Sequence, residues 1–287
     1  MTVGVVVTGA SSGIGAAIAR ELAGRGFRVF GTVRRPEDGA DLQRAGVTPV
    51  RMDVTDQASI ASARAEVEQA LAGAPLAALV NNAGVPAAGP LELLPLEDLR
   101  RVVEVNLVGV VAVTQAFLPL LKAARGRIVN ISSVAGRRAM PFMGPYSASK
   151  FALEAVSDSL RRELLPFGVD VIVVEPGSIQ SKIWDKVRAM DISRYGGTPY
   201  QRVLERFRDI VLRSGEQGLP ADRVARAVAR ALVARRPPTR ILVVDSVLAQ
   251  KLVEWLPDRW LDRLIGRAVW KKDVRPPGQP TANRSAR

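Results

Sequence analysis

Short apolar runs rich in β-branched residues alternate along the chain with longer segments whose apolar residues recur at helical spacing. The apolar runs have the length of buried strands, and they predict strands at 3–8, 27–33, 47–54, 76–81, 127–132, 169–174 and 240–244. The intervening segments predict helices at 16–25, 56–72, 96–124, 146–165 and 220–234. This regular alternation indicates an α/β fold, a doubly wound parallel sheet with helices on both faces.

The pattern changes after residue 245, so residues 1–245 are predicted to form a single domain. Residues 246–272 form an amphipathic helical extension, which Pro257 splits into two short helices. Its leucines and tryptophans alternate with basic residues, so it can cover the cleft or a subunit interface, or lie on an anionic membrane. We favour packing on the protein itself, since apolar stripes are more often core. Residues 273–287 are rich in Pro, Gly and Arg and are predicted to be disordered.

Composition narrows the possible chemistry. The 287 residues include no cysteine and no histidine, which excludes disulfides, thiolate catalysis, Ser-His-Asp schemes and His-ligated metals. Proton transfer must therefore use Tyr, Lys, Asp, Glu, Ser or water, and no metal is expected. The net charge of +13 comes from scattered basic residues without a nucleic-acid-binding motif, so we interpret it as a solvated surface. Neither a signal peptide nor an uninterrupted apolar run of membrane length is evident, and a cytoplasmic location is expected.

A glycine turn joins the first strand to the first helix. The order of strand, Gly-rich turn and helix is typical of the Rossmann-type dinucleotide-binding unit. Gly9 allows the tight turn, Gly13 lets the backbone approach a pyrophosphate, and Gly15 permits close packing of helix on strand. The helix N-terminus offers N–H groups to the phosphates. The cofactor-contacting turn is completed by Ser11, Ser12 and Ile14.

The end of the second strand bears on the choice of cofactor. An acidic residue there binds a ribose 2′-hydroxyl, whereas a basic residue accommodates a 2′-phosphate. Val33 occupies the acidic position and is followed by Arg34 and Arg35. NADP(H) is therefore favoured, with Arg34 as first contact and Arg35 as second, and NAD(H) is the alternative.

A tyrosine and a lysine mark the candidate catalytic site. Tyr146 and Lys150 are four residues apart in a predicted helix, so they share a face. A neighbouring ammonium favours the phenolate and is expected to lower the pKa of the tyrosine. Ser133 lies thirteen residues before Tyr146, at the carboxyl end of the fifth strand, where such sheets bind ligands.

Taken together, these motifs resemble the short-chain dehydrogenase/reductase family in its compact form. The resemblance rests on Thr8 with its G-x-x-x-G-x-G turn, Asn81-Asn82-Ala83-Gly84, Asn106, Ser133 and the Y-x-x-x-K pair, and it spans about residues 3–245. It implies that Tyr146 is the general acid/base, and that Lys150 lowers the tyrosine pKa and binds the nicotinamide ribose. It further implies that Ser133 binds the substrate oxygen and that Asn106 bends its helix and holds a relay water.

The resemblance also assigns further cofactor contacts. It places Asp53 and Val54 at the adenine, and the turn with Asn81, Ala83 and Gly84 along the cofactor. The nicotinamide end is assigned to Pro176, Gly177, Ile179 and Ser181, the last replacing the family's usual threonine. Ser12 stands where many NADP-dependent members have a basic residue, which argues against NADP(H).

Residues around the expected substrate cleft are mostly apolar: Val134, Phe142 and Met143, with Ile183 and Trp184 in a lid at 182–218. They favour a lipophilic alcohol or ketone of steroid, retinoid or long-chain type, as in the steroid and retinol dehydrogenase branch. A small polar or carrier-linked keto substrate is the alternative. A non-catalytic NADP(H)-sensing protein is disfavoured because tyrosine and lysine are both present. The family's usual pairing of subunits predicts a homodimer or homotetramer.

Overall fold

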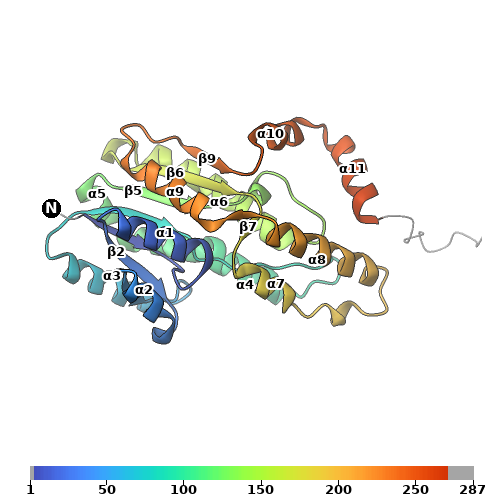
Figure 1. Cartoon of the computed structure of the whole chain (residues 1–287), viewed down its shortest axis with the longest axis horizontal. Helices are drawn as coiled ribbons and strands as arrows, with labels where there is room; N and C mark the ends of the chain where they lie inside the picture. Colours follow the sequence, from blue (N-terminus) through green and yellow to red (C-terminus); the bar gives the residue numbers. More distant parts are fainter. Residues whose placement is uncertain (1–2, 271–287) are drawn as a thin grey trace, which may run out of the picture.

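Seven parallel strands form the centre of the protein in a computed structural model that describes residues 3–270 (Figure 1). The strand order is β3-β2-β1-β4-β5-β6-β9. The strands are β1 (Gly4–Val7), β2 (Arg28–Val33), β3 (Thr48–Arg51), β4 (Leu76–Asn81), β5 (Arg127–Ile131), β6 (Asp170–Pro176) and β9 (Arg240–Val243). The order reverses direction at β1, so β1 and β4 flank the switch point where ligands bind in such sheets. The predicted α/β class is confirmed.

Helices cover both faces of the sheet. One apolar core lies between the sheet and α1 (Gly13–Gly24), α2 (Ala40–Arg44) and α9 (Ala221–Val233). A second core lies between the opposite face and α3 (Gln57–Leu71), α5 (Gly109–Ala124) and the end of α6 (Gly144–Glu163). Val5 and Val7 belong to the first core and Val6 to the second. Alternate side chains of a strand point to opposite faces, so a wholly apolar strand serves both cores.

The predicted helix at 96–124 is continuous but irregular. α4 (Leu96–Val103) runs into a π-helical turn at Glu104–Val108, and α5 follows directly. Among residues 3–270, Leu96–Ala124 is the one helix long and apolar enough to cross a membrane. Phe117 and Leu121 are fully buried against the sheet. This helix is therefore part of the protein core.

Two segments of the C-terminal half extend beyond the sheet. The segment predicted as a lid contains α7 (Ile183–Arg188) and α8 (Gln201–Glu216), between the paired short strands β7 (Ile179–Gln180) and β8 (Leu219–Pro220). The extension forms α10 (Val247–Trp255) and α11 (Asp258–Trp270), and the predicted break at Pro257 is confirmed. Both helices lie at the edge of the molecule (Figure 1). The tail at 273–287 lies outside the described residues.

Candidate active site

The glycine turn between β1 and α1 leaves room for a ligand to approach the backbone. Gly9 and Gly13 have positive φ angles of 63° and 58°, which L side chains rarely adopt. A Cβ on Gly9 would lie 2.9 Å from the Cα of Ala83, and one on Gly13 would lie 3.1 Å from the Cβ of Ser181. A Cβ on Gly15 would collide with the carbonyl oxygen of Gly9. This backbone cradle at a helix N-terminus fits the phosphates of a dinucleotide.

The Asn-Asn-Ala-Gly turn after β4 is hydrogen-bonded to the end of β1 and the start of the glycine turn. The amide of Asn82 donates to the carbonyls of Thr8 (3.0 Å) and Gly9 (3.1 Å), while the Thr8 hydroxyl accepts from the backbone of Asn82 and Ala83. Sequence reasoning noted Thr8 and Asn82 but gave neither a role. The structure shows that they join the glycine turn to the turn after β4.

Asn81 was predicted to touch the cofactor, but its side chain points into the protein interior. Its side-chain amide is buried and donates to Thr114 (3.0 Å) and Asn130 (2.9 Å) in the interior between β4, β5 and α5. Any contact of Asn81 with the cofactor therefore falls to its main chain.

Positive charge gathers where a 2′-phosphate is expected. Arg35 is engaged by Asp38 at 2.9 Å, whereas Arg34 is exposed and has no ion pair within residues 3–270. Hydrogen bonds from Thr55 lower the pKa of Asp53, and attraction to Arg34 adds to this effect. Burial lowers the pKa of Lys186 in the lid, and repulsion from Arg34 contributes. Arg34 thus lies close enough to both side chains to influence their charge, and Lys186 is a basic neighbour that sequence reasoning missed.

Ser133 and Tyr146 meet at the carboxyl end of β5. Ser133 caps a short 3-10 turn, its hydroxyl accepting from the backbone of Ala135 at 3.1 Å. The nearby Ser133 hydroxyl lowers the pKa of the Tyr146 phenol. Burial outweighs this effect and raises the pKa of Tyr146 above its ordinary value.

Lys150 lies one turn along α6 from Tyr146. Its ammonium donates to the carbonyl of Ile131 at 2.8 Å and lies 5.8 Å from the centre of the Tyr146 ring. Burial lowers the pKa of Lys150 to about 8, and attraction from Glu154 opposes that shift. The predicted net lowering of the tyrosine pKa is therefore wrong for this structure, because burial raises the pKa of Tyr146 more than its neighbours lower it.

Asn106 joins three parts of the site. It lies in the π-helical turn, so the predicted local change in the helix is confirmed. Its amide donates to the carbonyl of Val85 (3.0 Å) and to the hydroxyl of Ser149 (3.1 Å), and it accepts from the Val85 N–H (2.8 Å). The Ser149 hydroxyl donates to the carbonyl of Tyr146 at 2.7 Å. Asn106 therefore connects the turn after β4 to α6.

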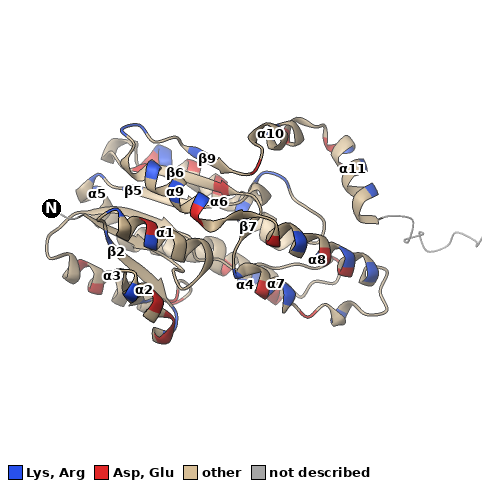
Figure 2. Cartoon of the chain, viewed as in Figure 1, with Lys and Arg blue, Asp and Glu red and all other residues tan. Residues whose placement is uncertain are grey.

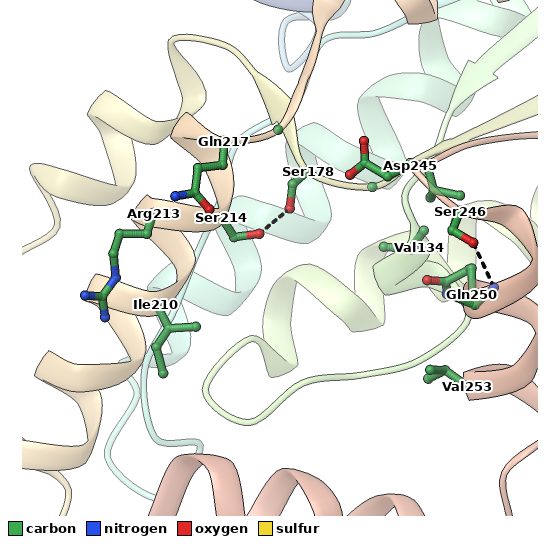
Figure 3. A pocket seen from close by; sticks show the side chains of 14 residues that line it. Val134, Ser178, Ile210, Arg213, Ser214, Gln217, Asp245, Ser246, Gln250 and Val253 are labelled. Carbon is green, nitrogen blue, oxygen red and sulfur yellow. Dashed lines mark hydrogen bonds between the residues drawn. The ribbon is translucent and has the colours of Figure 1, made fainter.

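A cavity of about 730 Å³ opens between α8 and α10 (Figure 3). Val134, the residue after Ser133, forms part of its wall. Apolar and polar side chains alternate around it, namely Ile210, Val244, Ala249 and Val253 with Ser178, Arg213, Ser214, Gln217, Asp245, Ser246 and Gln250. The hydroxyls of Ser178 and Ser214 form a 2.6 Å hydrogen bond across one side.

Other predicted substrate residues lie outside this cavity wall. Phe142 packs in an apolar cluster with Phe207 and Trp270, and Met143 lies against the same cluster. The indole of Trp184 donates to the carbonyl of Ile179 at 2.7 Å and packs on Gly215, which holds α7 against α8. Ile183 precedes it in α7 and is half-buried. Sequence spacing could not find the cavity, since α10 supplies much of its wall from a distant segment.

Comparisons with known proteins agree with this arrangement. The short chain dehydrogenase family matches residues 4–192. The chain is 38% identical to the "NADPH-dependent 3-dehydrocapnine reductase" of Ornithobacterium rhinotracheale, covering 93% of this chain and 97% of the relative. It is 37% identical to human "Retinol dehydrogenase 5", covering 92% and 86%. The crystal structure of a Burkholderia phymatum short chain dehydrogenase/reductase in complex with NAD superposes with a TM-score of 0.74 at 28% identity, covering 96% and 97%.

The chain belongs to the short-chain dehydrogenase/reductase family and is an NAD(P)-dependent oxidoreductase.

Proposed function

We propose that the protein interconverts a carbonyl and an alcohol on a lipophilic substrate, with NADP(H) as cofactor. The observation that carries this proposal is that Ser133 and Tyr146 come together at the sheet edge, where Ser133 lowers the pKa of the phenol, and that Val134, the residue after Ser133, lines the cavity. The bound nicotinamide supplies the hydride for reduction. The alternative functions are reduction of a small polar or carrier-linked keto substrate, and NADP(H) sensing without turnover.

The side chains of the site divide the work of proton transfer. Tyr146 donates its hydroxyl proton to the carbonyl oxygen, and the raised pKa keeps that proton in place at neutral pH. Ser133 donates to the same oxygen and orients it. The buried Lys150 ammonium stabilises the phenolate left behind and binds the nicotinamide ribose. Asn106 holds the turn after β4 against α6, and the relay water attributed to it is part of this proposal.

NADP(H) is favoured by the charge around Arg34. A 2′-phosphate between Arg34 and Lys186 would relieve the repulsion between the two cations. The name of the Ornithobacterium relative, which specifies NADPH, agrees with this choice. NAD(H) is the alternative.

A lipophilic substrate is favoured by the apolar part of the cavity wall, Val134, Ile210, Val244 and Val253. The relatives named for retinol and 3-dehydrocapnine point in the same direction. The hydroxyl and amide groups among the lining residues suit a polar group at one end of such a molecule.

The test is a panel of ketones and alcohols assayed with NADPH/NADP and NADH/NAD side by side. Arg34→Ala should raise the KM for NADPH about 10-fold or more and spare NADH, since a hydrogen bond to a charged group contributes about 1.5–3 kcal/mol. Arg44→Ala, which changes an exposed arginine paired with Asp41, is the matched control. An unchanged NADPH preference in Arg34→Ala would contradict the cofactor assignment.

Tyr146→Phe tests the chemistry in the same panel. Loss of a general acid should lower kcat about 100-fold or more while NADPH binding, followed by its fluorescence, stays near wild type. Near-normal turnover in this variant would contradict the role of Tyr146.

A further inference from the structure

The apolar side of α10 faces away from the protein. Ala249, Gln250 and Val253 line the cavity. Leu248, Leu252 and Trp255 are four and three residues apart, so they share the opposite helix face. Leu248 is 71% exposed and Trp255 is 83% exposed. The predicted packing on the protein itself holds for Ile265 and Trp270 of α11, but not for Leu248, Leu252 and Trp255 of α10, which are exposed.

α11 likewise has one side packed on the protein and one side with exposed apolar residues, and its exposed side also carries positive charge. Val269 is buried and Ile265 packs against the apolar cluster of the lid. On the outer side, Trp260 is 63% exposed and lies one turn before the exposed Leu264. Arg263 and Arg267 are exposed, and their spacing puts them beside these two residues.

In the extension, two acidic side chains pair with the protein body and the basic side chains face solvent. Arg137 and Arg138 lie on the loop after β5, and they pair with Glu254 (3.7 Å) and Asp258 (2.7 Å). Two of the three acids of α10 and α11 are thus matched by the protein body, and Asp262 is the third. The basic residues Lys251, Arg259, Arg263 and Arg267 are exposed. The sequence beyond α11 adds Lys271, Lys272, Arg275, Arg284 and Arg287.

Two kinds of partner can cover tryptophan and leucine side chains at such a surface. A twofold contact between two copies of this chain uses the same surface on both copies. It tends to bring Arg263 and Arg267 of one copy close to the same arginines of the other copy, and these like charges repel. An anionic bilayer surface instead attracts those cations, and its interfacial layer accommodates the amphipathic ring of tryptophan beside buried leucine. The combination of residues therefore favours lipid.

We propose that α10 and α11 dock the protein onto bilayers that contain anionic phospholipid, through Leu248, Leu252, Trp255, Trp260 and Leu264 flanked by the four exposed basic residues. Because the other face of α10 lines the cavity, docking places the cavity beside the membrane surface. The surface is defined by exposure and charge alone, so it is independent of the reaction and cofactor proposed above.

The experiment is co-sedimentation of the full chain with phosphatidylcholine vesicles that contain either no anionic lipid or about a third phosphatidylserine. Binding is expected to the anionic vesicles and to weaken as salt is raised. R263E/R267E should weaken it about 30-fold, since each basic residue near such a surface contributes about 1 kcal/mol. W260A/L264A should weaken it about 10-fold or more through lost apolar burial.

Matched variants separate docking from general effects. R226E/R230E reverses two exposed arginines one turn apart on α9, with the same change in net charge. L165A/V233A removes exposed apolar side chains that lie outside the extension. Both should sediment like wild type, and melting temperature shows that every variant is folded.

Three results would overturn the proposal: equal binding to neutral vesicles, equal loss in the control variants, or no binding at low salt. Sedimentation velocity without lipid supplies a further check. A wild-type dimer that W260A/L264A converts to monomer would show that this face is a subunit contact instead.

Discussion

At the scale of single residues, the buried cation of Lys150 bears most directly on how the site works. Its ammonium is enclosed by β5 and α6, with the Ile131 carbonyl as hydrogen-bond partner. Burial favours the neutral form of a lysine, whereas the attraction of Glu154 one turn along the helix favours the charged form. The balance leaves its pKa at about 8, so its charge changes within the range in which enzymes are assayed.

This pKa predicts the pH dependence of reduction. Below pH 8 the Lys150 ammonium is charged and stabilises the Tyr146 phenolate, and above pH 8 it is neutral and that stabilisation is lost. The kcat/KM for carbonyl reduction should therefore fall as pH rises through about 8. Lys150→Arg keeps the positive charge at all accessible pH values, so the kcat/KM of this variant should not fall as the pH rises through this range. A profile that bends at the same pH in both proteins would rule out Lys150 as the titrating group.

At the scale of elements, the site depends on how closely α1 approaches β1. Gly15 allows this approach because its missing Cβ leaves space for the Gly9 carbonyl and the Asn82 amide. The π-helical turn between α4 and α5 has a similar positional role, since it carries Asn106 to the Val85 backbone and Ser149. In both places a local feature of one helix determines its distance from a neighbouring turn.

Gly15→Ala should therefore destabilise the protein and weaken NADPH binding. Forcing a methyl group into this contact costs about 1–3 kcal/mol, and helix and strand must separate to relieve it. Gly24→Ala is the matched control, because it lies in the same helix with open space where its Cβ would be. Alanine there should be neutral or stabilising by up to about 1 kcal/mol. Thermal melts and NADPH titration measure both effects, and equal behaviour of the two variants would contradict the packing argument.

At the scale of the whole molecule, the charge is spread rather than concentrated. Figure 2 shows Lys and Arg beside Asp and Glu over most helices, as expected for a solvated surface. Ion pairs also join distant segments: Arg137 meets Glu175 at 2.8 Å, and Arg240 meets Glu154 at 3.1 Å. Three exposed apolar residues lie on or between the helices α4, α5 and α6, namely Leu96, Val108 and Phe151. The homodimer or homotetramer stays a prediction, and these helices are where the subunits would meet.

Arg138 should decide how firmly the extension is held. Its guanidinium donates to the Asp258 carboxylate and to the carbonyls of Glu254 and Leu256, which joins the loop after β5 to both helices. Arg138→Ala removes charged hydrogen bonds of about 1.5–3 kcal/mol each, so hydrogen exchange in α10 and α11 should quicken about 10-fold or more. The sheet should be unaffected. Arg236→Ala changes an exposed arginine elsewhere and is the control; unchanged exchange in Arg138→Ala would show that other contacts hold the extension.

The sequence by itself determined the strand and helix alternation, the glycine turn, and the residue types at the catalytic centre. Strand periodicity is a local property, and Gly9, Gly13 and the Tyr146–Lys150 spacing are short-range patterns with few physical interpretations. The short elements α2, β7 and β8 were missed because their few residues carry no periodic signal. The assignment of Asn81 to the cofactor overlooked its side-chain partners, Thr114 and Asn130, which are distant in the sequence.

Only the tertiary structure decided the protonation balance, the cavity and the outer face of the extension. The pKa values of Tyr146 and Lys150 depend on burial, which no spacing rule supplies. The cavity wall combines residues from the β5 loop, α8 and α10, which meet only after folding. An amphipathic pattern shows that a helix has an apolar side, but only packing shows whether that side faces the protein or the solvent. For α10, the stripe with Leu248, Leu252 and Trp255 faces the solvent.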